Sequence, residues 1–327
     1  MVQYNQYIIS VKNSGYTHTE AAALAQAHGG HLATINDAEE NALILGFLAQ
    51  DDLLWSTAPG GDPRVGPWIG LTKAQDGSWQ WESNWPMTYT AWHPTQPDNY
   101  QGIESCGVYF DFQGTIGWAD NAADPVAAGL LPAISALIEV SGATKKLDGT
   151  KGHDFIWGGT VKNLIDGKGG NDILYGGEGH DTIGGGEGRD TLYGGDGYDN
   201  LFGEAGKDVM YGDTGVDNFT GGADADRFVF LPGDSGNTLE TCDIITAFSH
   251  AERDKIDLRG FDAIPGGDHD PLEFIGKKAF TGDGQVRVYV EEGRLLVAIN
   301  LTGTTEPEVL IFLTPDSDTP RGTDFLL

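Results

Sequence analysis

Two kinds of hydrophobic spacing divide the chain near residue 149. Before that point, apolar residues first recur at helical spacing and then form short runs between long polar loops. The helical spacing predicts helices over 19–27, opened by the cap-like Thr17 and Glu20, and over 36–50, opened by Asn36 and Glu39 as a capping box. A short strand is expected in the GGHLATI segment between the helices, and further strands are predicted over 68–71, 79–83, 106–112 and 134–140.

From Gly149 to Val229 a period of nine residues replaces this pattern. Nine units follow one another in one register; the sixth position is Asp in eight of them, with Asn163 as the exception, and the eighth is always apolar. Six glycine-rich residues can form a turn, because glycine adopts conformations that other residues resist. Three residues then form a short strand whose middle side chain enters a narrow core. A disordered linker would have no reason to keep this apolar position, so the period predicts a stack of turns.

The residues after Val229 lose the period and return to strand-like runs. These runs cover 243–248, 254–261, 285–290, 294–299 and 308–313, and the chain ends in DFLL. Because a stack of repeats leaves an apolar end that must be covered, we expect 230–327 to form a β-rich cap. The polar segment 141–148 is expected to be the joint between the first region, 1–140, and the repeats, 149–229.

The charge of the chain limits its partners. With 49 acidic and 19 basic residues its formal net charge is -30, which disfavours binding to nucleic acid and to anionic membranes. Such a chain repels itself unless it binds cations, and calcium is the expected ion because it takes oxygen ligands. Two distant cysteines exclude a disulfide framework. No run of eighteen apolar residues predicts a membrane span, and MVQYNQYIIS lacks the features of an amino-terminal signal peptide.

The nine-residue unit is identified as the repeat-in-toxin (RTX) nonapeptide, a calcium-binding parallel β-helix signature. The resemblance implies several calcium ions bound by the aspartates of the sixth positions. Within 149–229 there are fifteen acids and six bases, so ion binding and folding should be one event. The predicted metal ligands are Asp154, Asp172, Asp181, Asp190, Asp199, Asp208, Asp217 and Asp226, with a weak or empty position at Asn163.

The order of landmarks in residues 1–140 resembles the C-type lectin-like fold. It runs from EAAALAQAHGGHLATINDAEENALI through PWIGL, WQW, QPD and GWAD to a final ISALIEV strand. The fold class is therefore expected to be an α+β C-type lectin-like domain joined to an all-β parallel β-roll with a β-rich cap. The usual cysteines near Ala25, Ala123 and Ile138 are missing, a loss that can be tolerated if calcium and packing compensate for the disulfides. Trp68, Trp81 and Trp118 lie in apolar runs and are expected in the core.

The loop QPDNY, residues 96–100, carries the expected site. In sugar-binding members of the family, a loop of this form supplies calcium ligands, an acid follows it, and a Trp-Asn-Asp strand adds more. By this resemblance Gln96, Asp98, Glu104 and Asp120 bind one calcium ion, with a cis peptide before Pro97 aiming the loop side chains. An incomplete oxygen shell leaves room for two vicinal sugar hydroxyls.

Neighbouring positions refine this expectation. The Gln-Pro-Asp order resembles galactose-type members, with fucose as the close competitor, and Tyr100 is expected to stack on the sugar. Ala119 replaces the asparagine of Trp-Asn-Asp, so either Asn121 substitutes for it or the ion has one ligand fewer. The auxiliary calcium site of the family is expected to be absent, because Asn99 and Ser105 stand where acids would be.

The expected function is calcium-dependent binding of galactose- or fucose-type glycans on host or other cell surfaces. The repeats, the DKIDL segment and the apolar end resemble substrates of type I secretion. The resemblance implies an uncleaved carboxyl-terminal export signal within 230–327 and a secreted bacterial adhesin, extracellular or at the cell surface, that is exported by the type I machinery. Two alternatives remain: a lectin-like fold that binds protein or ice, and a non-catalytic module of an RTX exoenzyme. No H-E-x-x-H or G-x-S-x-G motif occurs, so no enzyme activity is expected.

Overall fold

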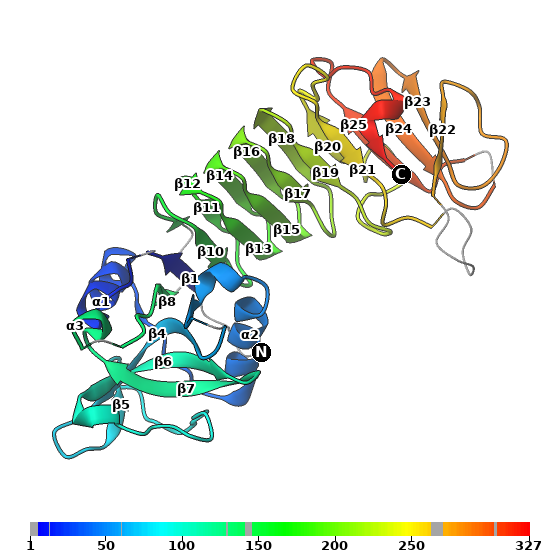
Figure 1. The fold of residues 1–327 in the computed structure, drawn as a ribbon. Helices are drawn as coiled ribbons and strands as arrows, with labels where there is room; N and C mark the ends of the chain where they lie inside the picture. Colours follow the sequence, from blue (N-terminus) through cyan, green and yellow to red (C-terminus); the bar gives the residue numbers. More distant parts are fainter. Residues whose placement is uncertain are drawn as a thin grey trace. The chain divides into compact units, whose positions relative to one another are not determined.

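The computed structural model describes residues 6–12, 14–59, 61–128, 130–140, 146–262, 271–303 and 306–327. The chain divides into two compact units, residues 1–144 and 145–327 (Figure 1). The predicted joint over 141–148 ends earlier than expected, because Lys146–Asp148 already forms strand β9 of the second unit and pairs with β11. Residues 141–145 of that joint lie outside the described residues.

The first unit combines helices with a twisted sheet. Its elements are β1 (Gln6–Val11), α1 (His18–Ala27), β2 (His31–Leu32), α2 (Ala38–Leu48), η1 (Asp52–Leu54), β3 (Ser56–Thr57), β4 (Arg64–Lys73), β5 (Trp79–Trp81), η2 (Tyr100–Gly102), β6 (Glu104–Phe112), β7 (Thr115–Ala122), α3 (Pro125–Ala128) and β8 (Ser135–Val140). The strand order is β1–β8–β4–β6–β7, with β2 beside β8, and β3 and β5 beside β4. Since β1 and β8 pair antiparallel, the beginning and the end of this unit lie together (Figure 1).

Both predicted helices are present, with one correction at a cap. The capping box of Thr17 and Glu20 opens α1 as expected. Helix α2 is opened by Asp37 rather than Asn36, because the Asp37 carboxylate accepts hydrogen bonds from the backbone N–H groups of Glu39 and Glu40. A charged acceptor at the positive end of a helix is the stronger cap.

The aromatic core holds the sheet against the loops. Trp68, Trp81 and Trp118 are buried as expected, and the rings of Trp81 and Trp118 meet edge to face at 5.4 Å. The predicted strands are present, and periodicity alone predicts neither β1 nor β7. Strand β7 forms a hairpin with β6 whose register shifts between Glu104 and Cys106. This hairpin brings the acids of the expected site to one end of the sheet.

The second unit begins as two parallel sheets that share the repeats alternately. One sheet has the order β10–β13–β15–β17–β19–β21–β26 and the other β9–β11–β14–β16–β18–β20–β25. Their bounds are β9 (Lys146–Asp148), β10 (Asp154–Trp157), β11 (Leu164–Asp166), β12 (Gly169–Gly170), β13 (Ile173–Gly179), β14 (Thr182–Gly188), β15 (Thr191–Gly197), β16 (Asn200–Gly206), β17 (Val209–Tyr211), β18 (Asn218–Ala223), β19 (Arg227–Val229), β20 (Asp243–Thr246), β21 (Lys255–Asp257), β25 (Val309–Leu313) and β26 (Phe325–Leu326).

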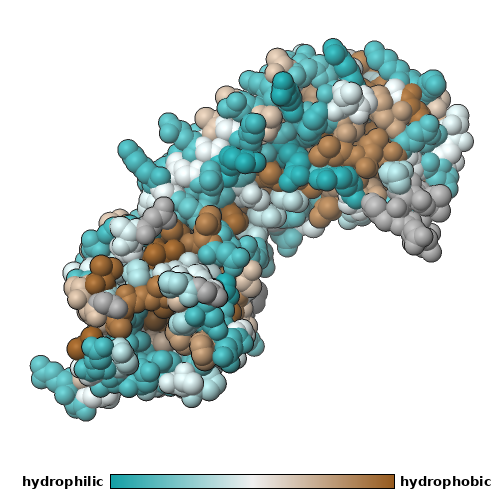
Figure 2. Space-filling model, viewed as in Figure 1, coloured by the Kyte–Doolittle hydropathy of each residue, from teal (hydrophilic) through white to brown (hydrophobic). Residues whose placement is uncertain are grey.

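Two nonapeptides make one full turn of this β-roll. Leu174 therefore pairs with Leu192 in one sheet, and Ile183 with Leu201 in the other. The apolar eighth positions from Ile156 to Phe228 are all at most 1% exposed, which confirms the predicted narrow core. On the face shown in Figure 2, the surface over β13–β18 is mostly hydrophilic or neutral. The apolar eighth-position residues of the repeats are thus inside the roll.

The cap continues one sheet of the roll. Strand β20 pairs parallel with β25, which pairs antiparallel with β24 (Arg294–Asn300), and β24 with β23 (Gln285–Glu291). The short β22 (Glu273–Gly276) lies beside β23. The chain ends in η3 (Gly322–Asp324) and β26, which pairs with β21 of the other sheet. No helix among the described residues is long and apolar enough to cross a bilayer.

Candidate functional site

Three carboxylates of the first unit converge at one point. Asp98, Glu104 and Asp120 each offer an oxygen, and these oxygens lie within 4.8 Å of one another. Asp98 comes from the loop before η2, Glu104 from the first residue of β6, and Asp120 from β7. Asp98 is exposed, whereas Glu104 and Asp120 are buried. The structure thus brings together acids separated by up to 22 positions in the sequence.

Hydrogen bonds fix the loop on these acids. The two carboxylate oxygens of Asp120 accept from the backbone N–H groups of Asp98 and Asn99, each at 3.0 Å. Glu104 accepts from the backbone N–H of Tyr100 at 2.6 Å. The Gln96–Pro97 peptide is cis, as expected. The two buried acids therefore position the loop that carries the exposed one.

The electrostatics of this cluster favour a cation. Burial, with the nearby charge of Asp120 adding to it, raises the pKa of Glu104 to about 7, and burial also raises the pKa of Asp120. Within the part of the chain that the structure describes, no basic side chain forms an ion pair with any of the three acids. A divalent ion would relieve the repulsion between them.

Gln96 completes the oxygen set. Its Oε1 atom is buried and has no hydrogen-bond partner, and its side chain lines a cavity of about 270 Å³ together with the three acids. A buried carbonyl oxygen without a donor is costly unless something else satisfies it. One amide and three carboxylates form the hard oxygen set that calcium prefers. The residues present therefore fit a calcium ion.

The residues around the cavity differ in whether their side chains are available to an ion or to a ligand. Asn121 lines it, and its side chain is engaged locally: Oδ1 accepts from the N–H of Ala122 at 2.8 Å, and Nδ2 donates to the carbonyl of Leu131 at 3.4 Å. Ala119 offers no side-chain ligand. Tyr100 also lines the cavity and is 54% exposed, so most of its ring is available to a ligand.

The second unit arranges its aspartates in two columns. From Asp154 to Asp208, the backbone N–H of each repeat aspartate donates to Oδ1 of the aspartate 18 residues later, as from Asp181 to Asp199 at 2.7 Å. The other oxygen, Oδ2, is buried without a hydrogen-bond partner throughout most of the series. This holds for Asp172, Asp181, Asp190, Asp199, Asp208, Asp217 and Asp226. Asn163 takes the place of an aspartate in the second column, where its N–H donates to Asp181.

Glycine carbonyls lie near these orphaned oxygens from Asp172 to Asp208. A Cβ on Gly176 would lie 2.5 Å from Oδ2 of Asp181 and 2.4 Å from the carbonyl oxygen of Gly194. Only a glycine at position 176 leaves this space free. The space is bordered by two hydrogen-bond acceptors, the Asp181 carboxylate and the Gly194 carbonyl. Burial raises the pKa of these aspartates, to about 7 at Asp181 and about 9 at Asp217. The carboxylate and carbonyl set again fits calcium.

The structure also shows two aspartates that belong to these columns and that the nine-residue pattern did not predict. Asp243 and Asp254, in the cap, accept from the N–H groups of Asp217 and Asp226. The signal was present in the sequence, because each is followed two residues later by a buried isoleucine, Ile245 or Ile256, as in the repeats.

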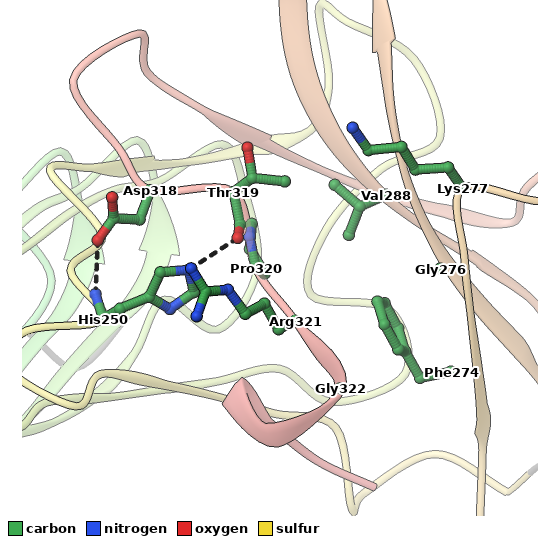
Figure 3. A pocket seen from close by; sticks show the side chains of 10 residues that line it. All are labelled: His250, Phe274, Gly276, Lys277, Val288, Asp318, Thr319, Pro320, Arg321 and Gly322. Carbon is green, nitrogen blue, oxygen red and sulfur yellow. Dashed lines mark hydrogen bonds between the residues drawn. The ribbon is translucent and has the colours of Figure 1, made fainter.

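A separate cavity of about 470 Å³ in the cap has a different character (Figure 3). Lys277 and Arg321 bring positive charge to its wall, and Asp318 is its single acid. Asp318 accepts from the backbone N–H of His250 at 2.8 Å, which ties the segment before η3 to the loop after β20. This lining does not suit a calcium ion.

Comparisons with known proteins agree with both parts of the chain. A family model for the lectin C-type domain matches residues 14–124, and a model for the RTX calcium-binding nonapeptide repeat matches overlapping segments within 146–235. The chain is 34% identical over 124 residues to the Alpha-N-acetylgalactosamine-specific lectin of Patiria pectinifera, covering 36% of this chain and 69% of that lectin. It is 35% identical over 95 residues to asialoglycoprotein receptor 2 of Mus musculus, covering 28% of this chain and 27% of the receptor.

Among solved structures, the C-type lectin CEL-I from Cucumaria echinata is similar, with 21% identity and a TM-score of 0.31, over 40% of this chain and 87% of that one. The matched region thus spans most of the small lectins and about a quarter of the receptor. From the family model and the Patiria relative, this chain belongs to the C-type lectin domain family, and its lectin domain is followed by RTX calcium-binding nonapeptide repeats.

Proposed function

We propose that the lectin domain binds galactose- or fucose-type glycans through a calcium ion held by Gln96, Asp98, Glu104 and Asp120. The observation that carries this proposal is the convergence of three carboxylates beside the unpartnered amide oxygen of Gln96, in a cavity open to ligand. A closed structural ion site would not need a cavity at its side. An open one leaves coordination positions for sugar oxygens.

Each residue has a distinct part in sugar binding. The ion, when bound, supplies positive charge that attracts two vicinal hydroxyl oxygens. The carboxylates of Asp98 and Glu104 accept hydrogen bonds from these hydroxyls, and the Gln96 amide donates to one of them. Asp120 positions the loop through its bonds to the N–H groups of Asp98 and Asn99. The exposed ring of Tyr100 packs on the apolar face of the sugar.

Two features support the galactose-type choice. The Gln-Pro-Asp order of residues 96–98 resembles galactose-type members, and the Patiria relative is named for its specificity for α-N-acetylgalactosamine, a galactose derivative. Asn121 uses its side chain locally, so the ion has one ligand fewer than in members with Trp-Asn-Asp. We expect a dissociation constant for a monosaccharide on the order of millimolar, about -4 kcal/mol.

The repeats supply the wider setting of this proposal. RTX repeats suggest a secreted protein, and we infer that this one is a bacterial adhesin exported by a type I system and displayed at the cell surface. Calcium outside the cell would fold the roll and load the sugar site together. Weak single-site binding becomes useful adhesion when many copies engage one glycan-covered surface.

The second candidate is a lectin-like module that recognises a protein surface or ice without calcium. Ala119 favours it, because this position lacks the amide ligand of sugar-binding members. Under that function, binding would survive changes at the acids.

The test uses the whole chain on a glycan array with calcium present. The double change Gln96→Glu with Asp98→Asn alters the site without changing net charge. Its matched control, Gln113→Glu with Asp76→Asn, makes the same chemical changes at two exposed positions. The proposal expects galactose- or fucose-type glycans to bind the natural chain and the control but not the site variant. Equal binding by all three, with calcium still bound, would place recognition elsewhere.

A further inference from the structure

The two aspartate columns of the roll continue past the last nonapeptide. The N–H of Asp217 donates to Oδ1 of Asp243 at 2.9 Å, and that of Asp226 donates to Oδ1 of Asp254 at 3.2 Å. The spacing grows from 18 residues to 26 and 28, so the sequence period is lost while the geometry persists. The cap therefore provides one more member to each column.

Protein donors close one column at both of its ends. At the far end, Oδ2 of Asp254 accepts from the N–H of Ser249 at 2.8 Å. At the near end, Oδ2 of Asp154 accepts from the N–H of Thr150 at 2.5 Å and from its hydroxyl at 2.8 Å. In this column Oδ2 of each terminal aspartate is satisfied by protein donors.

The other column is left open at Asp243. Its Oδ1 accepts from Asp217, but its Oδ2 is buried and has no hydrogen-bond partner, and the residue is 0% exposed. The Oδ2 atom of Asp217 is in the same condition. Two fully buried carboxylates, each with an orphaned oxygen, are costly unless a cation or protons neutralise them.

The surroundings of Asp243 are acidic. Burial raises its pKa to about 7, with the charge of Asp234 adding to the effect, and Asp213 acts in the same direction on Asp217 and Asp234. No basic side chain in the described ranges forms an ion pair with any of these four aspartates. The set offers only carboxylate oxygens, which suit a hard divalent ion and not a thiolate or imidazole metal.

We propose that Asp243 and Asp217 hold a further calcium ion where the repeats meet the cap, with the negative charge of Asp234 adding to the attraction for the ion. This ion lies beyond the nonapeptides, because Asp243 belongs to β20 of the cap. Strand β20 pairs with β25, and the N–H of Asp243 is held by the hydroxyl of Ser235, which donates to the carbonyl of Leu310 in β25. The ion thus links the cap sheet to the last turn of the roll.

Counting bound ions tests this site. Asp243→Asn keeps the Oδ1 acceptor for Asp217 and replaces the orphaned oxygen by an amide N–H₂. Asp254→Asn is the matched control, because the same change there removes an oxygen that a protein donor already satisfies. Whole chains at saturating calcium are compared by equilibrium dialysis with metal analysis, and circular dichroism verifies the fold.

We expect Asp243→Asn to bind one calcium ion fewer than the natural chain and Asp254→Asn to bind the same number. An unchanged count in Asp243→Asn, or the same loss in both variants, would overturn the proposal. If Asp243→Asn does not fold, the anomalous signal of calcium in crystals of the natural chain shows whether an ion is bound at Asp243. A peak beside Oδ2 of Asp243 supports the site, and its absence there, with peaks in the repeats, refutes it. Neither experiment involves sugar, so its failure leaves the lectin proposal untouched.

Discussion

The candidate sugar site and the β-roll both gather buried carboxylates, but they gather them in different ways. The sugar site is assembled once, from a loop and a hairpin, and its acids border a cavity. The roll repeats one arrangement every 18 residues, and from Asp172 to Asp208 it places the aspartate Oδ2 atoms near glycine carbonyls. An ion in the roll is enclosed by protein on this account, whereas an ion at the sugar site keeps positions for a ligand.

This difference separates structural from functional dependence on calcium. The lectin domain has an aromatic core that includes the buried Trp68, Trp81 and Trp118. The roll buries an apolar residue at the eighth position of every nonapeptide, and its interior acids repel one another. We therefore expect calcium to be required for the fold of the roll and for the ligand of the lectin domain.

The largest effect expected is from removing calcium. In chelator at neutral pH, backbone amides of 146–229 should lose their protection against hydrogen exchange, because uncompensated buried carboxylates destabilise the stacked turns. Amides of β1, β6 and β8 should remain protected. Exchange measured by mass spectrometry on the whole chain resolves the two regions. Simultaneous loss of protection in both would show that the lectin domain also depends on calcium for its fold.

A large effect of pH is expected in the same chelated protein. The folded-state pKa values of the repeat aspartates lie above the ordinary value of 3.8, at about 6 for Asp190 and Asp199, about 8 for Asp172 and about 9 for Asp217. The folded roll thus holds more protons than the unfolded chain, so its stability is present at low pH and is lost as pH rises through these values.

Thermal unfolding followed by circular dichroism checks this sign. Without calcium, the unfolding temperature of the roll should fall between about pH 5 and about pH 8. With saturating calcium the trend should reverse, because the ion binds the deprotonated form. A calcium-free roll that becomes more stable over this range would contradict the assignment of these aspartates as destabilising charges.

Within the roll, glycine substitutions should act strongly. Gly188 has a φ of 142°, and a Cβ there would lie 1.4 Å from the carbonyl oxygen of Gly170. Gly188→Ala should destabilise the calcium-bound roll by more than about 1 kcal/mol, since the turn must shift. The control is Gly46→Ala in α2, where a Cβ meets nothing within 4 Å and helix propensity improves. Urea unfolding with calcium present should separate the two, and equal stabilities would show that the turn adapts.

At the sugar site the effect should be on binding and not on folding. Glu104→Gln removes one ligand charge but keeps an acceptor for the N–H of Tyr100. Sugar affinity should fall at least about tenfold, equivalent to about 1.4 kcal/mol, while the unfolding temperature of the calcium-free lectin domain stays the same or rises because a buried charge is gone. Calorimetry with galactose measures this, with exposed Glu292→Gln as the control. A parallel loss of stability would indicate a structural role.

The smallest effect is expected from the ring beside the site. Tyr100→Ala removes an aromatic surface that is 54% exposed, so folding should be unaffected. Loss of stacking is worth about 0.5–1.5 kcal/mol, which predicts an affinity for galactose roughly two- to tenfold weaker. Calorimetric titration with galactose measures this effect too, and we expect Tyr100→Phe to keep most of the affinity. If the alanine variant binds as well as the natural chain, the sugar does not contact this ring.

The contrast between the two regions also explains what could be predicted from the sequence. The structure of the roll is determined by local sequence, since each nonapeptide contains the residues of its own turn, an acidic or amide sixth position and a core residue. All the eighth positions are buried as predicted. The nine-residue period did not predict Asp243 and Asp254 as members of the aspartate columns, because long insertions interrupt the period before them. Each is nevertheless followed two residues later by a buried isoleucine.

The candidate sugar site could be predicted only through family resemblance. No local rule brings Asp98 to Asp120, because their proximity depends on the β6–β7 hairpin and on the loop bonds to Asp120. Two details required the structure: Asp37 caps α2 in place of Asn36, and the Asn121 side chain is engaged by Ala122 and Leu131. Both depend on hydrogen-bond geometry that several neighbouring side chains could satisfy equally well in the sequence.

The most direct test of the central claim is a crystal structure of the whole chain grown with calcium and galactose. The account predicts one calcium ion among the oxygens of Gln96, Asp98, Glu104 and Asp120, with two vicinal galactose hydroxyls completing its shell beside Tyr100. A lectin domain that contains no ion there while the roll is loaded, or a sugar bound away from these residues, would contradict it.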